Sequence, residues 1–192
     1  MTKTFFEKIV QHPSAHARFV NSLSFIEYIG ARKILKGQRA QDFSLELLSH
    51  ASEEIRHAQI LKRLALRISP EVVSYQREHL LAGERAEGYI QEVDRAVEEA
   101  LGKNKTWQNY LVTTLVVEER AETFYTEYEK VLAECGYGGI LISIVKEEVG
   151  HLKKMREWLS QEAIVSEDRL LNLRKVESNV FDSFLNAALR EI

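Results

Sequence analysis

Proline occurs only twice in the 192 residues of this chain, at positions 13 and 70. Because proline inside a helix removes a backbone hydrogen bond and clashes with the preceding turn, its scarcity permits long uninterrupted helices. The nine glycines add few further points at which a helix is weakened. No segment alternates apolar and polar residues in the way a half-buried strand does. We therefore expect an all-α fold, and the length suits a single domain over 1–192.

Apolar residues recur at helical spacing in segments that are separated by turn signals. We expect a short helix at 3–11, four long helices at about 15–37, 43–68, 106–134 and 140–160, and a last helix at about 166–190. The more polar region 71–101 is expected to form one or two helices, starting from Ser69 and Pro70. Ser14 and Asp42 are expected to cap the helices that follow them. This order predicts an antiparallel four-helix bundle with a long crossover between its second and third helices, plus extra N- and C-terminal helices.

Composition and charge argue against several other classes of protein. The net charge is −3 and no basic stripe is present, so nucleic-acid binding is not indicated. Cys135 is the only cysteine, which excludes an intrachain disulfide and a thiolate metal cluster. No apolar run approaches the roughly 20 residues of a membrane span, and the N-terminus lacks a signal-peptide core. We expect a cytoplasmic protein with no membrane partner.

The most specific chemical pattern is a pair of Glu-x-x-His motifs on two of the long helices. One motif is formed by Glu54 and His57, the other by Glu148 and His151. Residues three apart lie on one face of a helix, so each motif offers a carboxylate and an imidazole to one point in space. Chance alone produces such motifs in a glutamate-rich chain, so their surroundings must decide whether they bind metal.

Glu27 is the only acidic residue between positions 8 and 41, and its neighbours in the sequence are apolar. Burying an ionised carboxylate costs several kcal/mol unless a cation compensates it. That cation is either Arg32 or Lys33 in an ion pair, or a bound metal ion. In an antiparallel hairpin, Glu27 and Glu54 flank the first interhelical turn about evenly and lie at similar depth.

Glu118 follows the apolar run LVTTLVV and shares a helix face with Glu122. Glu118 lies more residues away from the loop between the two helices than Glu148 does. Glu122 is nearer to that loop and therefore closer to the depth of Glu148. Glu118 is the preferred ligand candidate on this helix, and Glu122 is the alternative.

The order Glu, Glu-x-x-His, Glu, Glu-x-x-His on four successive long helices resembles the ferritin-like di-iron carboxylate superfamily. The matching residues are Glu27 in FIEYIG, Glu54 and His57 in EEIRH, Glu118 in VEERAE, and Glu148 and His151 in EEVGH. The resemblance covers roughly 15–68 and 106–160. It implies a ferritin-like bundle that holds two iron ions at a Glu4His2 site, with manganese or a mixed Fe/Mn site as the alternative.

The resemblance also implies roles for these residues. Glu54 and Glu148 would bridge the two metals, while Glu27 with His57 and Glu118 with His151 would complete their shells.

The function implied is that of a non-haem di-iron oxidoreductase, an oxygenase or oxidase. It would activate O2 or peroxide to oxidise or hydroxylate a small or tethered organic substrate, with electrons from an external donor. One alternative is a ferroxidase, iron-handling or rubrerythrin-like peroxide-reducing protein. Another is a metal-free helical scaffold, and a homodimer is left open.

Neighbouring polar residues are candidates to orient the ligand histidines through their second ring nitrogen. These candidates are Glu122, Glu147 and Arg32. His50, one turn before Glu54, is expected to be an ordinary core histidine, with a supporting role at the site as the alternative. Tyr125 is expected to pack in the core, with a redox role as the alternative.

Overall fold

The computed structural model describes residues 2–37, 44–162 and 165–192 of the chain. Within these ranges there are seven α-helices and one short 3-10 helix, and no strand. The helices are α1 (Thr2–Ile9), α2 (Pro13–Gly37), α3 (Leu45–Ile68), η2 (Arg77–His79), α4 (Gly83–Leu101), α5 (Thr106–Glu134), α6 (Ile142–Glu162) and α7 (Glu167–Arg190). The expected all-α class is confirmed for the described residues.

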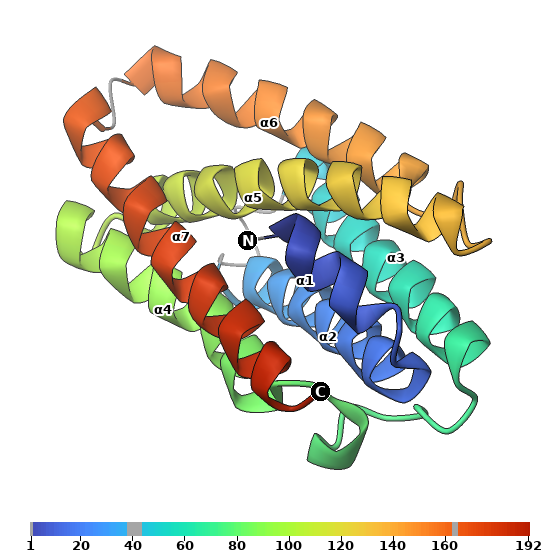
Figure 1. Cartoon of the computed structure of the whole chain (residues 1–192). Helices are drawn as coiled ribbons and strands as arrows, with labels where there is room; N and C mark the ends of the chain where they lie inside the picture. The colour runs from blue at the N-terminus through green and yellow to red at the C-terminus, as the bar shows by residue number, and fades with distance from the viewer. Residues whose placement is uncertain (1, 38–43, 163–164) are drawn as a thin grey trace.

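The long helices are arranged as two hairpins with a third helix pair beside them. α2 packs chiefly against α3, and α5 packs chiefly against α6. α4 and α7 contact each other, and α4 also touches α2 and α5 (Figure 1). The short α1 lies against α2, α5 and α7. The four helices that carry the sequence motifs therefore form two packed pairs.

Two helix starts differ from those expected. α2 begins at Pro13, because proline is tolerated in the first turn, where its missing N–H needs no partner. Ser14 consequently lies inside the helix and does not cap it. The expected cap Asp42 lies outside the described residues. α3 is capped by Ser44, whose hydroxyl oxygen accepts a hydrogen bond from the Leu47 N–H at 3.3 Å.

The connection between α3 and α4 is less helical than expected. Ser69 ends α3 instead of starting a new helix, since its N–H is bonded to the carbonyl of Ala65. The chain then passes through η2, and only one long helix, α4, forms, beginning at Gly83. α2 holds this connection in place: the Ser22 hydroxyl donates to the Leu81 carbonyl at 2.7 Å and accepts from the Leu81 N–H at 2.9 Å.

A side chain of α5 sets where α6 begins. The Glu129 carboxylate accepts hydrogen bonds from the backbone N–H groups of Gly139 and of Leu141, the latter at 2.9 Å. The chain therefore folds back beside α5 after Glu134, so that α6 starts level with Glu129. This reduces the offset between Glu118 and the ligand candidates of α6 that their sequence numbers imply.

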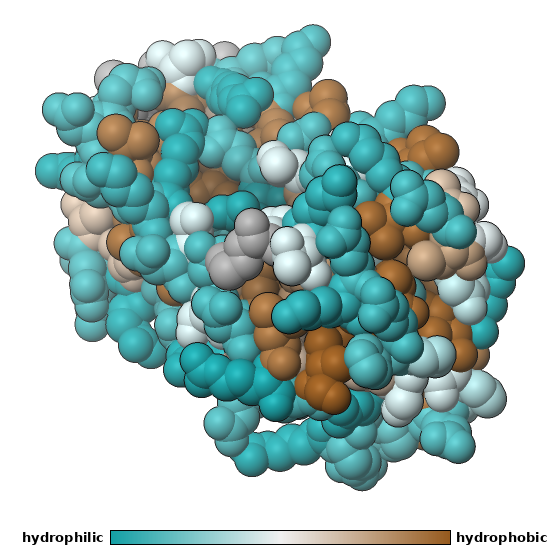
Figure 2. Space-filling model, in the orientation of Figure 1, coloured by the Kyte–Doolittle hydropathy of each residue, from teal (hydrophilic) through white to brown (hydrophobic). Residues whose placement is uncertain are grey.

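The buried apolar side chains form one continuous cluster that all seven α-helices join. Figure 2 shows that the outer face in that view is mainly hydrophilic, with scattered apolar patches. None of the helices in the described ranges is long and apolar enough to cross a membrane.

Candidate metal centre

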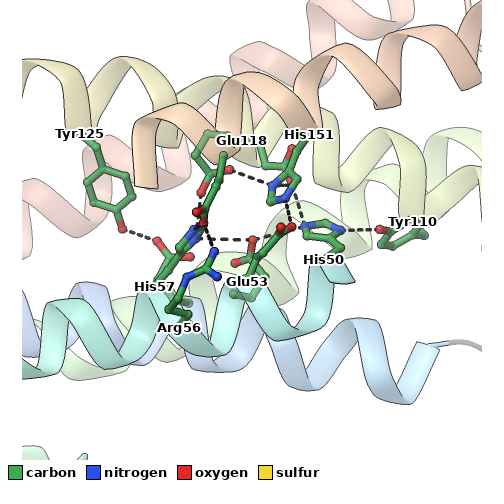
Figure 3. A network of polar contacts seen from close by, with 12 residues as sticks. His50, Glu53, Arg56, His57, Tyr110, Glu118, Tyr125 and His151 are labelled. Carbon is green, nitrogen blue, oxygen red and sulfur yellow. Dashed lines mark hydrogen bonds and ion pairs between the residues drawn. The ribbon is translucent and has the colours of Figure 1, made fainter. Parts of the chain in front are cut away.

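Seven acidic and histidine side chains meet in the interior between α2, α3, α5 and α6 (Figure 3). They are Glu27 on α2, His50, Glu54 and His57 on α3, Glu118 on α5, and Glu148 and His151 on α6. None of the seven is more than 7% exposed. Charged side chains are almost never buried to this degree without partners or a metal, so the cluster needs compensation.

The seven side chains fall into two groups, and each group could hold a metal ion. One group is His50, Glu54, Glu118 and His151, and the other is Glu27, Glu54, His57 and Glu148. In each group, one ligand atom from every member lies within 4.8 Å of the others. Glu54 belongs to both groups, so a single carboxylate connects the two positions.

The first group has the spacing of a metal shell. His50 Nε2 lies 2.9 Å from Glu118 Oε1 and 3.3 Å from Glu54 Oε1. His151 Nδ1 lies 3.5 Å from the same Glu118 oxygen. Two ligand atoms bound at about 2.1 Å and at right angles to each other are about 3 Å apart. The donor atoms therefore need only small shifts to surround one ion.

In the second group, Glu148 directs its two oxygens toward different histidines. Glu148 Oε1 lies 3.2 Å from His57 Nδ1, and Glu148 Oε2 lies 3.5 Å from His151 Nδ1. Because those histidines belong to different groups, the Glu148 carboxylate spans the two positions. The bridging roles that the resemblance implies for Glu54 and Glu148 stay a prediction.

Several buried donor and acceptor atoms in the cluster lack a hydrogen-bond partner within the described residues. They are the Nδ1 atoms of His57 and His151, both carboxylate oxygens of Glu118, and Glu148 Oε2. Their short mutual contacts lack the angles of hydrogen bonds. Such groups are costly to leave unsatisfied, and all five atoms are of the kinds that ligate metals.

Glu177 on α7 shows how this chain buries an acid for a structural purpose. Its carboxylate accepts three hydrogen bonds of 3.0–3.2 Å from the guanidinium of Arg120. It also accepts one of 2.7 Å from the hydroxyl of Tyr89. Glu27 has no such counter-ion among the described residues, because Lys33 pairs with an acid of α4 and Arg32 is exposed. The ion-pair alternative for Glu27 therefore finds no support.

Two acidic residues outside the ligand groups contact the histidines at the ring nitrogen that faces away from the cluster. Glu147 Oε2 lies 2.8 Å from His57 Nε2, and Glu53 Oε2 lies 2.7 Å from His151 Nε2. Arg56 donates a hydrogen bond to the same Glu147 oxygen. These contacts fix which ring nitrogen of each histidine faces the cluster, and Nδ1 is the one that does.

Carboxylates around the histidines keep their rings protonated in the metal-free protein. Burial by itself lowers the pKa of His57, but the facing carboxylates of Glu148 and Glu54 outweigh burial and raise this pKa to about 10. Burial likewise lowers the pKa of His151, and contacts with Glu118 and Glu148 overcome it and raise the pKa to about 12. The positive rings partly compensate the buried acids when no ion is bound.

His50 is placed differently from the expectation of an ordinary core histidine. Its Nε2 faces Glu118 and Glu54, and its Nδ1 lies 2.7 Å from the Tyr110 hydroxyl. Burial lowers the His50 pKa, but the two carboxylates outweigh it and raise the pKa to about 9. The signal available in the sequence was its spacing, one helical turn before Glu54 and on the same face.

Tyr125 contacts the cluster and is more than a packing residue, since its hydroxyl donates a hydrogen bond to Glu27 Oε1. Burial, followed by repulsion from Glu54, raises the pKa of Glu27 well above its usual value. A neutral Glu27 beside ionised neighbours lowers the repulsion within the metal-free cluster.

The other candidates from the sequence lie apart from the ligand groups. Glu122 is half-buried, belongs to neither group, and contacts the Thr123 hydroxyl at 3.3 Å. Arg32 stacks over the Tyr28 ring at 5.5 Å from its centroid. The structure thus brings Glu118, and not Glu122, into the cluster.

A pocket of about 60 Å3 opens beside the cluster. Its lining includes Glu54, Glu118 and His50 of the cluster, together with Gly30 and Ile90. Candidate metal positions therefore adjoin free space that a small molecule can fill.

No family model matches the chain, and comparisons with curated proteins and with solved structures give no significant match.

Proposed function

We propose that this chain is a non-haem di-iron oxidoreductase with a ferritin-like bundle, using O2 or peroxide to oxidise a small organic substrate. The observation that carries the proposal is the pair of buried ligand groups joined by Glu54 and spanned by Glu148. A protein without metal has no evident reason to bury four acids in one place. The four-helix arrangement of Glu and Glu-x-x-His supports the ferritin-like assignment.

The donor set fits two divalent ions of the iron or manganese kind. It contains four carboxylates and three imidazoles, one imidazole more than the Glu4His2 site expected from the sequence. Four carboxylate charges balance the charges of two divalent ions. Imidazole and carboxylate ligands suit iron and manganese, whereas zinc sites in proteins more often use four tetrahedral ligands. Manganese or a mixed Fe/Mn site is the alternative loading.

Bound ions of this kind supply the redox chemistry, by passing electrons to O2 or peroxide and so generating an oxidant for the substrate. The protein's own residues provide the setting. Glu53 and Glu147 orient two ligand histidines, and Tyr110 contacts the third. Burial of the cluster excludes bulk water from the reacting side.

The pocket beside Glu54 and Glu118 favours an organic substrate over simple iron oxidation. An iron-handling protein needs a polar path for hydrated ions, whereas this pocket has mostly apolar walls, including Ile34, Ile90 and Val117. The ferroxidase alternative would show O2 consumption with Fe(II) alone. An external electron donor is part of the proposal, since the cluster must be reduced again after each turnover.

The test is metal binding followed by oxygen uptake. Protein purified without chelator is analysed for metal, and chelated protein is titrated anaerobically with Fe(II). We expect about two ions per chain. Glu118→Ala should reduce this to one or fewer, whereas the matched control Glu122→Ala, one turn further along α5, should leave it unchanged.

Oxygen uptake by the loaded protein then separates the two redox functions. We expect slow uptake with Fe(II) alone and faster, sustained uptake when a substrate and a reductant are both supplied. Failure of the wild-type chain to bind Fe(II) or Mn(II) at all would overturn both functions and leave the metal-free scaffold.

A further inference from the structure

The pocket beside the cluster is lined by a basic residue as well as by candidate metal ligands. Its lining includes Glu54, Glu118 and Lys33, and Lys33 lies six residues beyond Glu27 on α2. Six residues correspond to about 9 Å along the helix axis. The pocket thus offers a cationic group and the metal-facing acids to the same bound molecule.

Lys33 is partly unsatisfied in its surroundings. Its Nζ atom is buried, pairs with the Asp94 carboxylate of α4, and has no further hydrogen-bond partner in the described part of the chain. An ammonium group has three N–H donors, and Asp94 cannot use all of them. Asp94 is also engaged by the Thr113 hydroxyl at 3.2 Å. Lys33 therefore retains capacity for a second anionic partner.

Lys33 is nearer to solvent than the metal-facing acids are. The side chains of Lys33 and Asp94 are 28% and 26% exposed, although the Lys33 Nζ atom itself is buried, whereas Glu54 and Glu118 are at most 7% exposed. A carboxylate bound at Lys33 would therefore lie on the more exposed side of the pocket, with its apolar part toward the cluster.

The apolar walls of the pocket select a slender apolar body. Ile34, Ile90 and Val117 are among the residues that form these walls. Gly30 keeps the pocket open, because a Cβ there would lie 3.5 Å from Glu54 Oε2 and 3.6 Å from Ile90 Cδ1. The free volume of about 60 Å3 has room for a few water molecules, since one water needs about 10–15 Å3.

We propose that this pocket binds an unbranched organic monocarboxylate, with its carboxylate on Lys33 and its chain end at Glu54 and Glu118. The pocket's role as a substrate site rests on the proposed function, whereas binding of the acid does not. Lys33 is here a specificity residue, and because it belongs to neither ligand group, its replacement should leave metal loading unaffected.

Calorimetric titration of the chelated and the Fe(II)-loaded chain with hexanoate and with 1-hexanol tests this proposal. We expect hexanoate to bind the wild type at least tenfold more tightly than hexanol does, since a charge-assisted hydrogen bond contributes to one and not the other. Lys33→Met should weaken hexanoate binding tenfold or more and leave hexanol binding unchanged. Asp94→Asn should tighten hexanoate binding several-fold, because it removes the competing carboxylate.

The matched control is Lys36→Met, which removes the same charge from an exposed position on the same helix and should change nothing. Equal binding of hexanoate to wild type and Lys33→Met, or equal affinities for hexanoate and hexanol, would overturn the proposal. If hexanoate binding depends on Lys33 but no metal is taken up, the pocket assignment stands and the proposed oxidoreductase function fails.

Discussion

Glu53 of α3 holds His151 of α6, with 2.7 Å between Glu53 Oε2 and His151 Nε2. The reverse contact also exists, because Glu147 of α6 holds His57 of α3 at 2.8 Å. In each Glu-Glu-x-x-His segment, the second glutamate faces the cluster and the first supports the histidine of the opposite helix. The two segments therefore depend on each other for the geometry of their ligands.

The reciprocal contacts predict that Glu147 controls metal affinity without being a ligand. Glu147→Ala leaves the His57 ring free to rotate and less basic, so Fe(II) affinity should fall about 10–100-fold while helix content is kept. Anaerobic Fe(II) titration measures the change. Glu157→Ala, an exposed acid on the same helix, is the control and should retain wild-type affinity. Unchanged affinity in Glu147→Ala would show that the ring needs no such support.

Glu27 and Glu177 should respond in opposite ways to the same substitution. Glu27→Gln removes the cost of protonating this acid when it is buried, and the amide oxygen still accepts the Tyr125 hydrogen bond, so the chelated protein should be as stable or up to about 1 kcal/mol more stable. Glu177→Gln loses the charge that Arg120 binds, and its free energy of unfolding should fall by about 1.5–3 kcal/mol. Urea unfolding of both variants gives the comparison. Equal losses of stability would mean that Glu27 has a structural role only.

His50 should behave as a ligand. His50→Ala should reduce Fe(II) affinity at its position at least about tenfold, and Tyr110→Phe should have a smaller effect because it removes only the contact at Nδ1. An ordinary core histidine would lower the stability of the chelated protein but leave the metal content at two. Metal analysis beside thermal unfolding of the chelated variants separates these outcomes.

His16 predicts an acid-sensitive contribution to stability at a place remote from the metal cluster. The ring is 2% exposed, lies 2.5 Å from the Tyr128 hydroxyl, and burial lowers its pKa to about 4. Because the folded pKa is below the unfolded value of 6.5, the neutral ring is favoured by folding. Its contribution, roughly 3 kcal/mol at most, is complete above pH 6.5 and is lost as the pH falls toward 4.

The His16 prediction is checked by urea unfolding of the chelated protein between pH 7 and 4. His16→Gln keeps a hydrogen-bond acceptor for Tyr128 but cannot titrate, so its stability should fall less steeply with pH than that of the wild type. His12→Gln, exposed and one turn earlier, should follow the wild-type curve. Parallel curves for all three proteins would refute the assignment.

Much of the helix pattern and most of the site could be predicted from the sequence, because both depend on local periodicity. Residues three and four apart on a helix share a face whatever the fold, so each Glu-x-x-His motif presents its carboxylate and imidazole together once its helix is buried. Glu27 was identifiable because an isolated acid in an apolar stripe is rare. The last helix, expected at about 166–190 from its apolar spacing, likewise forms at Glu167–Arg190.

The errors arose where distant residues decide local structure. Ser69 and Pro70 have the sequence of a helix start, yet hydrogen bonds from α2 hold the following chain in an irregular path. His50 looked like a core residue because only the fold brings Glu118 to its Nε2. The sequence numbers also placed Glu122 closer than Glu118 to the level of Glu148, since they do not show that α6 begins beside Glu129.

That contact has a consequence for how the protein can vary. The Glu129 carboxylate binds the backbone N–H groups of Gly139 and Leu141. The length of the loop between Cys135 and Gly138 therefore does not determine where α6 begins. Insertions or deletions in this exposed loop should leave the ligands in register, whereas replacing Glu129 should let α6 slide along α5. Length variation is therefore tolerated next to a site that needs sub-ångström placement, since a side chain rather than the loop anchors the helix.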